Sequence, residues 1–195
     1  GFKWIADQIH QYETGKADHT FMFGFEESYG YLIKPFVRDK DAIQSLTLLA
    51  EVAAYYRSRN MTLYDGLQEL FKKYGYFREK TIANTYAGVD GPAKIKALMK
   101  KFREEAPTHF AGHQVVVTED FANGTKTTAD GEVSELGIPE SNVLRYILDD
   151  DTWIAIRPSG TEPKLKFYIG TSADTLDKAN EKLADFEKAL QEFAE

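Results

Sequence analysis

The sequence predicts an α/β unit over residues 1–75, followed by an α+β unit over residues 76–195 in which a mostly antiparallel sheet packs on helices. Helical spacing of apolar residues dominates the first unit, around one short strand-like segment. After Tyr76 there are several strand-like segments, turn signals and only two helical segments. The boundary is therefore predicted near Gly75. Because a single strand does not make a self-sufficient domain, we expect the beginning of the first unit to be missing.

Three segments of the first unit carry apolar residues three and four positions apart and are predicted to be helices: residues 2–12, 39–59 and 63–74. Thr62 is a suitable cap for the last of them, and Gly75 ends it. Residues 19–23 are rich in β-formers, which predicts a short buried strand that ends at Gly24. A loop over residues 25–30 is expected to follow.

The second unit has the alternation of strands, turns and helices that is typical of an α+β domain. Its predicted strands are residues 76–86, 115–117, 142–148, 152–156 and 164–169. Asn123-Gly124 is a strong hairpin-turn signal, and the acidic run 149–151 marks a second turn. Helices are predicted over residues 91–105, led by Gly91-Pro92, and 176–193, and each has an apolar face for the sheet.

The composition limits the classes of partner. The 195-residue chain has 31 acidic and 24 basic residues and a formal charge of −7, so a nucleic-acid partner is not expected. It has no apolar run of the roughly 18 residues that span a bilayer, so a membrane partner is not expected either. It contains no Cys, which excludes disulfides and Cys–zinc sites and fits a cytoplasmic protein.

The most informative string is Arg157-Pro158-Ser159-Gly160-Thr161-Glu162-Pro163-Lys164, between two predicted strands. Arg supplies a planar fork of donors for phosphate oxygens, Ser and Thr supply hydroxyl donors, and Gly lets backbone N–H groups approach an anion. Two prolines stiffen the ends of the loop, which reduces the entropy lost on binding. This chemistry suits a phosphate. Taken alone, however, the string is better explained as an ordinary strand-to-strand turn.

A second string, Gly24-Phe25-Glu26-Glu27-Ser28-Tyr29-Gly30, follows the predicted strand of the first unit. Ligands of α/β layers gather beyond the carboxyl ends of strands. Glu26 and Ser28 are two residues apart, so in extended backbone both project to one side. A carboxylate and a hydroxyl together suit the vicinal hydroxyls of a sugar. By itself, this string is better explained as a solvated acidic loop.

Together the two strings resemble the α-D-phosphohexomutase family, which contains phosphoglucomutases and phosphomannomutases. The third domain of that family has a Gly-Phe-Lys-like start, here residues 1–3, and a Glu-Glu-Ser-aromatic-Gly loop, here residues 26–30. An Arg-x-Lys-Asp segment, here residues 38–41, is also similar. The fourth domain carries a loop of Arg-Pro-Ser-Gly-Thr-Glu-Pro type, here residues 157–163. The resemblance implies the C-terminal part of the third domain over residues 1–75 and the complete fourth domain over residues 76–195.

The resemblance also implies roles for individual residues. Glu26 and Ser28 would hold the sugar hydroxyls, and Lys40 would lie near the substrate. A larger group would bind the phosphate that does not react: Arg157, Ser159, Gly160, Thr161 and Lys164. Of this group, Lys164 is the weakest candidate.

The reaction implied by the resemblance moves a phosphoryl group between the C1 and C6 oxygens of a hexose. It passes through hexose 1,6-bisphosphate and uses Mg²⁺. The family's phosphoserine loop, of Ser-His-Asn type, and its metal loop, of Asp-Gly-Asp-Gly-Asp type, do not occur in this sequence. We therefore expect no catalytic residue here, and missing N-terminal domains of the same chain as partners. The chain alone is expected to bind a sugar phosphate without transferring phosphate.

Two other classes of function are compatible with the same residues. One is a stand-alone sugar-phosphate-binding or regulatory module, and the other is a purely structural domain. Within the enzyme interpretation, mannose fits as well as glucose, because the two sugars differ only at C2, which these loops need not read. A pentose phosphate also fits, because relatives that act on pentoses carry a similar Gly-Phe-Glu-Glu string.

No metal site is expected within the chain itself. His109 and His113 have the i, i+4 spacing of some zinc sites, but Pro107 and Gly112 bracket them and no third ligand lies near them in the sequence. The acidic run 149–151 lacks the spaced ligands of a magnesium loop and is predicted to be a solvated turn.

Overall fold

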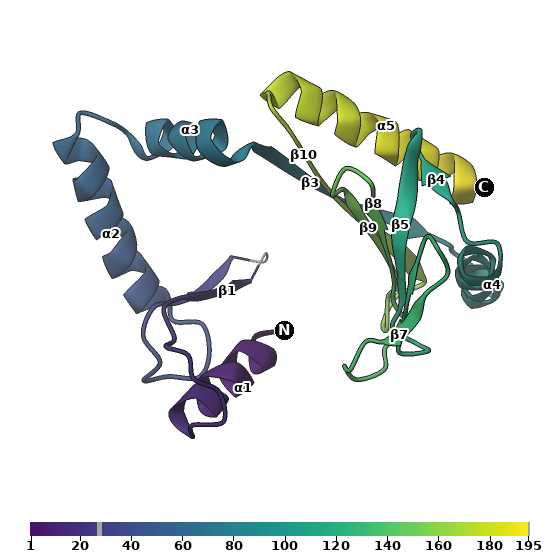
Figure 1. Cartoon of the computed structure of the whole chain (residues 1–195), viewed down its shortest axis with the longest axis horizontal. Coiled ribbons are helices and arrows are strands. Elements are labelled where there is room, and N and C mark those ends of the chain that lie inside the picture. Colours follow the sequence, from purple (N-terminus) through teal and green to yellow (C-terminus); the bar gives the residue numbers. More distant parts are fainter. Residues whose placement is uncertain (27–28, 195) are drawn as a thin grey trace. The chain divides into compact units, whose positions relative to one another are not determined.

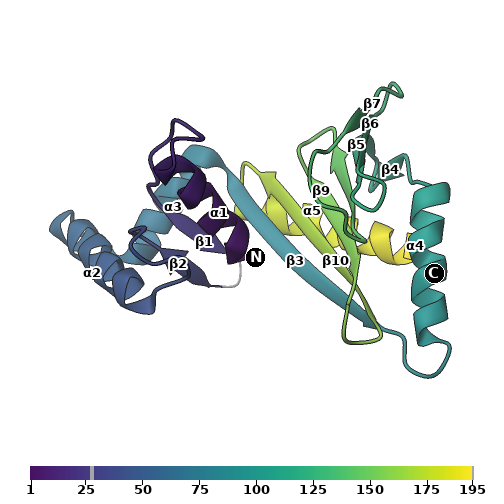
Figure 2. The same ribbon diagram turned by 90° about the horizontal axis from the view of Figure 1, so that it is seen from below.

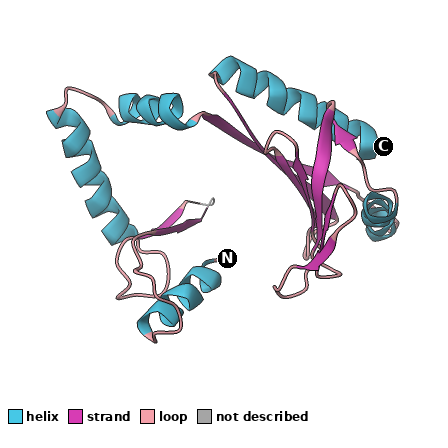
Figure 3. Cartoon of the chain, viewed as in Figure 1, coloured by secondary structure: helices cyan, strands magenta, loops and turns pink. Residues whose placement is uncertain are grey.

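The computed structural model describes residues 1–26 and 29–194. Backbone contacts divide the chain into two compact units, Gly1–Leu70 and Phe71–Glu195. Figure 1 labels the elements of both units, and Figure 3 distinguishes their helices from their strands. Within the described residues, no helix is both long enough and apolar enough to cross a membrane.

The described part of the first unit consists of helices and one antiparallel hairpin. The elements are α1 (Phe2–Glu13), β1 (Gly24–Glu26), β2 (Gly30–Leu32), α2 (Ala42–Ser58) and α3 (Leu63–Tyr74), the last of which continues past the end of the unit. A small core of Phe2, Ile9 and Leu32 joins α1 to β2. The three predicted helices are confirmed, with α2 somewhat shorter than expected.

The prediction of a strand over residues 19–23 is wrong. The first strand forms at residues 24–26 instead. Side chains in the predicted segment are not buried, and Met22 is 78% exposed. The strand begins at Gly24, whose backbone packs directly on α1: a Cβ there would lie 2.8 Å from a methyl carbon of Ile5. The predicted loop over residues 25–30 therefore contains the last two residues of β1 and the first residue of β2.

Side-chain caps explain where α2 and α3 begin. Asp41 Oδ1 accepts hydrogen bonds from the backbone N–H groups of Ile43, at 2.9 Å, and Gln44, at 3.1 Å. The predicted cap at Thr62 is confirmed, because its Oγ1 accepts from the N–H of Asp65 at 3.1 Å. Asp65 Oδ2 in turn accepts from the N–H of Thr62 at 2.8 Å, which completes a capping box.

The second unit is built on an antiparallel sheet. Among the described residues its strand order is β3-β10-β9-β8-β5-β6-β7, with β4 paired to β5. The elements are β3 (Tyr76–Thr85), α4 (Gly91–Glu104), β4 (His109–Phe110), β5 (His113–Asp120), β6 (Thr125–Thr128), β7 (Val133–Glu135), β8 (Leu144–Leu148), β9 (Trp153–Pro158), β10 (Lys164–Ala173) and α5 (Leu176–Ala194). Figure 2 shows β3, β10 and β9 side by side. All strands and helices predicted for this unit are confirmed.

Helices α4 and α5 cover one face of this sheet, and that face carries the core. Ile154 and Ile156 of β9 are fully buried and pack in one cluster with Phe102 of α4 and Phe186 of α5. Side chains alternate between the two faces along a strand. Arg157, the next residue of β9, therefore projects from the face that these helices do not cover, and it is exposed.

Candidate functional site

The loop between β9 and β10 is closed by its own backbone. The N–H of Ser159 donates to the carbonyl oxygen of Lys164 at 2.8 Å, and the N–H of Lys164 donates to that of Glu162 at 2.7 Å. Pro163 is tied to the end of β3, because its carbonyl accepts from the N–H of Tyr86 at 2.8 Å. The predicted phosphate string thus forms a short loop held at both ends by strands.

The hydroxyl of Ser159 faces the backbone N–H groups of this loop. Ser159 Oγ accepts from the N–H of Thr161 at 3.5 Å and from that of Glu162 at 3.3 Å. A hydroxyl that accepts in this way still has its own hydrogen to donate. Apart from Gly160 and its two chain neighbours, no atom of the described chain lies within 4 Å of the position where Gly160 would carry a Cβ, so open space remains beside the loop. The loop therefore has donors and room for a small anion.

Arg157 lies directly opposite Lys166 in the ladder between β9 and β10. Side chains at directly opposite positions are neighbours, and two like charges there repel each other. An anion between the guanidinium and the ammonium would remove that repulsion. Lys166 is not among the site residues predicted above, although the alternation of Lys164, Leu165 and Lys166 places both lysines on one face of β10.

Lys164 is already paired within the loop. Its Nζ lies 2.7 Å from Glu162 Oε1. The hydrogen bond from this ammonium is the main cause of the lowered pKa of the Glu162 carboxyl, which therefore carries its charge at neutral pH. Glu162 thus compensates the charge of Lys164. This pairing leaves less of its positive charge available to an anion.

On its helix side, the loop lines a groove of about 770 Å³ with α4. Lys96, Lys100 and Arg103 line the α4 wall, and Ser159 and Thr161 line the loop wall. The loop is therefore accessible from this side as well as from the face that carries Arg157.

In the first unit, the structure brings Glu26 and Lys40 together. Lys40 Nζ lies 3.3 Å from Glu26 Oε2 and 2.6 Å from Asp39 Oδ1. The hydrogen bond to Asp39 is the main cause of the raised pKa of Lys40, and Glu26 adds to it. The ammonium also lies 5.1 Å from the centre of the Phe2 ring, within cation–π range. Lys40 is therefore a firmly charged group beside the Glu26 carboxylate.

Gly30 makes this arrangement possible. The aliphatic part of Lys40 passes over its backbone, and a Cβ at Gly30 would lie 1.9 Å from Lys40 Cδ. Gly30, Lys40 and Ser45 belong to the wall of a groove of about 780 Å³ between the hairpin and α2. Ser28, the third residue predicted to bind sugar, lies outside the described residues.

Both units match models of one protein family. Residues 1–74 match "Phosphoglucomutase/phosphomannomutase, alpha/beta/alpha domain III", and residues 89–190 match "Phosphoglucomutase/phosphomannomutase, C-terminal domain". The chain is 42% identical over 186 residues to a phosphoglucomutase of Staphylococcus epidermidis, and 39% identical over 185 residues to one of Staphylococcus aureus. These alignments cover 95% and 94% of this chain but 33% of each relative. The chain thus spans about a third of the length of these relatives.

A solved structure shows the same fold. The open form of parafusin, a phosphoglucomutase from Paramecium, superposes with a TM-score of 0.61 over 97% of this chain and 32% of its own. Its sequence identity is 17%, so this likeness concerns the fold alone.

Proposed function

The chain belongs to the phosphoglucomutase/phosphomannomutase family, and we propose that it is the sugar- and phosphate-recognition portion of a hexose phosphate mutase. Such an enzyme interconverts hexose 1-phosphate and hexose 6-phosphate through a bisphosphorylated intermediate. The observation that carries the proposal is the β9–β10 segment, where Arg157 and Lys166 stand opposite each other in the strand ladder and the hydroxyl of Ser159 faces the N–H groups of the connecting loop. The similarity to proteins named phosphoglucomutase supports it.

In this proposal the second unit anchors the phosphate that does not react. Arg157 donates its planar fork to two phosphate oxygens, and Lys166 contributes a point charge. Ser159 and Thr161 donate hydroxyl hydrogens, and the N–H of Gly160 adds a backbone donor. Each charge-assisted hydrogen bond contributes about 1.5–3 kcal/mol, so a few of them hold a phosphate in spite of the negative net charge of the chain. This anchor lies away from the reacting oxygen and serves to orient the sugar.

The first unit is proposed to hold the sugar. The Glu26 carboxylate accepts hydrogen bonds from ring hydroxyls, while the Lys40 ammonium donates to ring or phosphate oxygens. Because the two groups lie 3.3 Å apart, one hydroxyl is able to bond to both of them. Ser28 is included on the family resemblance. A carboxylate acceptor and an ammonium donor held side by side suit a sugar phosphate that must bind in two orientations, because each ring hydroxyl is able to donate as well as accept.

Transfer itself is assigned to other domains of the same protein. The sequence contains neither a Ser-His-Asn loop for a phosphoserine nor an Asp-Gly-Asp-Gly-Asp loop for Mg²⁺. The residues present therefore do not fit the magnesium centre, and none of the roles above depends on it. We expect this chain to bind sugar phosphates and the bisphosphate intermediate without converting them.

We propose Gly75 as the boundary between the two recognition units. Its φ of +102° lets the chain leave α3 in a conformation that other residues rarely adopt. The division of contacts after Leu70 and the ends of the two family matches support a boundary in this region.

A titration followed by NMR tests the proposal. Glucose 1-phosphate, inorganic phosphate and glucose are added separately to the labelled chain. We expect the signals of residues 157–166 to shift with either phosphate compound, and those of Glu26 and Lys40 to shift only with the sugar phosphate. If neither region shifts with any of the three, the recognition function proposed for this chain is contradicted.

The Arg157→Ala variant locates the anchor. Loss of one charge-assisted hydrogen bond is expected to weaken phosphate binding by about tenfold or more. Arg57→Ala on α2 removes an exposed guanidinium in the first unit and serves as the matched control. Equal affinities of wild type and Arg157→Ala would show that the site assignment is wrong.

A further inference from the structure

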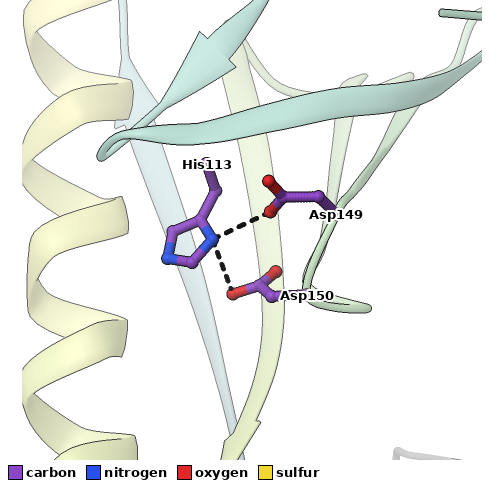
Figure 4. Close-up of side chains that lie close together, drawn as sticks. All are labelled: His113, Asp149 and Asp150. Carbon is purple, nitrogen blue, oxygen red and sulfur yellow. Dashed lines mark hydrogen bonds and ion pairs between the residues drawn. The ribbon is translucent and has the colours of Figure 1, made fainter.

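Among the residues that the structure describes, one group of side chains outside the proposed recognition site has the composition of a metal centre. His113 stands at the start of β5, and Asp149 and Asp150 lie in the turn between β8 and β9. His113 Nδ1 lies 2.9 Å from Asp149 Oδ1 and 3.2 Å from Asp150 Oδ2 (Figure 4). One nitrogen and two carboxylate oxygens from distant parts of the sequence thus point to a common centre, and all lie within 4.8 Å of one another.

Two tight turns hold these residues in place. Ala111 and Gly112, with φ of 46° and 83°, form the two-residue turn between β4 and β5, and His113 follows it directly. The pairing of Val115 with Leu148 brings the start of β5 beside the acidic turn. Strand pairing, not proximity in the sequence, therefore brings both Asp149 and Asp150 to His113.

Neighbouring groups orient the ligands. The second oxygen of Asp149 accepts from the N–H of Gln114 at 3.3 Å, and Asp150 Oδ1 accepts from the N–H of Thr152 at 3.0 Å. The His113 ring lies 5.5 Å from the ring of Phe186, a buried residue of α5. Outer contacts of this kind fix carboxylates and imidazoles in known metal centres.

We propose that His113, Asp149 and Asp150 form a binding site for a divalent transition-metal ion of the zinc type. Ligand atoms about 2.0–2.1 Å from a tetrahedral ion lie about 3.3 Å from each other, close to the two distances from His113 Nδ1. His113 is partly exposed, which leaves a fourth position for water. An imidazole nitrogen in the set favours zinc, cobalt or nickel over magnesium.

Lys182 limits the strength of the site without closing it. Its Nζ lies 2.6 Å from Asp150 Oδ2 and neutralises one of the two carboxylates. A carboxylate oxygen has two lone pairs, so Asp150 Oδ2 is able to accept from Lys182 and coordinate an ion at the same time. With His113 neutral, the two carboxylates and this ammonium sum to one negative charge. That charge attracts a divalent cation.

Calorimetric titration of the chain with Zn²⁺ tests the site, and the visible spectrum of the Co²⁺ form reports a tetrahedral environment. Wild type is expected to bind one Zn²⁺ saturably. Asp149→Asn and His113→Ala should each weaken binding by about tenfold or more. Because Asp149→Asn nearly preserves shape, it tests the proposal even if His113→Ala fails to fold, and circular dichroism checks the fold of each variant.

Two matched variants separate this site from general binding by surface side chains. His109→Ala removes the other histidine of the β4–β5 hairpin, and Asp151→Asn removes the neighbouring acid of the same turn; neither belongs to the proposed ligand set. Both should bind Zn²⁺ like wild type. Absence of saturable Zn²⁺ binding by wild type, or an equal loss in these two variants, would overturn the proposal.

Discussion

The lack of a side chain at Gly30 determines where the Lys40 side chain lies. Lys40 extends across the backbone of Gly30 to reach Glu26, and there is no room for a side chain below it. Glu162, in contrast, opposes an anionic ligand, because its carboxylate neutralises Lys164 in the phosphate loop. Residue-scale changes at these two positions should therefore have opposite effects on ligand binding.

Replacing Gly30 by Ala should weaken the binding of glucose 1-phosphate several-fold. The new methyl group would displace the Lys40 side chain and separate its ammonium from Glu26. NMR titration measures the affinity, and the signals of Glu26 and Lys40 report the displacement. Gly1→Ala is the control, because a Cβ there meets no atom within 4 Å beyond its own residue and chain neighbour. An unchanged affinity would show that Lys40 does not act from its observed position.

Replacing Glu162 by Gln should strengthen the binding of inorganic phosphate several-fold. The change removes a negative charge from the loop and frees the ammonium of Lys164 for the ligand. Calorimetry at constant ionic strength measures the affinity, since exposed charges are screened by salt. Glu140→Gln, at an exposed position outside the loop, controls for the change in net charge. A weaker affinity in Glu162→Gln would mean that Glu162 supports the loop instead of opposing the ligand.

At the scale of elements, the helices of the two units are stabilised differently. Helix α2 has no buried residue, and Ile43 and Leu46 are 76% and 67% exposed. Helix α4, in contrast, buries Ile95, Met99 and Phe102 in the main core. Because tertiary packing stabilises most helices in proteins, α2 depends more than α4 on its cap.

The cap at Asp41 makes α2 sensitive to acid. The N–H of Gln44 is the main cause of the lowered pKa of the Asp41 carboxyl, and the N–H of Ile43 adds to it. A pKa that is lower in the folded chain stabilises the helix at neutral pH, and this contribution is lost as the pH falls through that pKa. We expect the helical signal in circular dichroism to decrease as the pH falls through the pKa of Asp41.

Two variants isolate the contribution of Asp41. Asp41→Asn keeps a good capping residue but removes its charge, so the part of the acid transition due to α2 should disappear. Asp41→Ala removes the cap and should lower helicity at neutral pH as well. Identical acid transitions in wild type and Asp41→Asn would show that other carboxylates control the loss of helix.

At the scale of the whole molecule, the two units have cores of very different size. Phe2, Ile9 and Leu32 are the buried residues of the core cluster in the first unit. The cluster of the second unit joins both helices to most strands of the sheet. The free energy of local opening follows such packing, so the two units should not open together.

Amide hydrogen exchange should be slower after Gly75 than before it. The central strands β8, β9 and β10 should show the strongest protection, while α2 and the β1–β2 hairpin should exchange near the rate of local opening. Mass spectrometry of the exchanging chain resolves the two regions. Equal protection in both would show that the first unit is better supported than its small core indicates.

Much of the fold followed from local patterns in the sequence. Apolar spacing predicted the five helices, and Thr62 and Gly75 marked the limits of α3. Strand-like segments and turn signals predicted β3, β5, β8, β9 and β10, whereas the short strands β4, β6 and β7 were not predicted. The failure at residues 19–23 has a physical cause, because β-propensity does not decide which of two adjacent segments finds a pairing partner. The family and the fold class were also accessible from the residues, since the two recognition strings are specific in combination.

What the sequence alone determined were features set by neighbours along the chain: helix faces, caps, turns and the chemistry of the two recognition loops. Only the tertiary structure decided which distant side chains meet. It placed Lys166 opposite Arg157, Lys40 across Gly30 and His113 beside Asp149. Strand register and the close approach of backbones decide such meetings, and both arise from pairing over long sequence distances that local spacing does not encode.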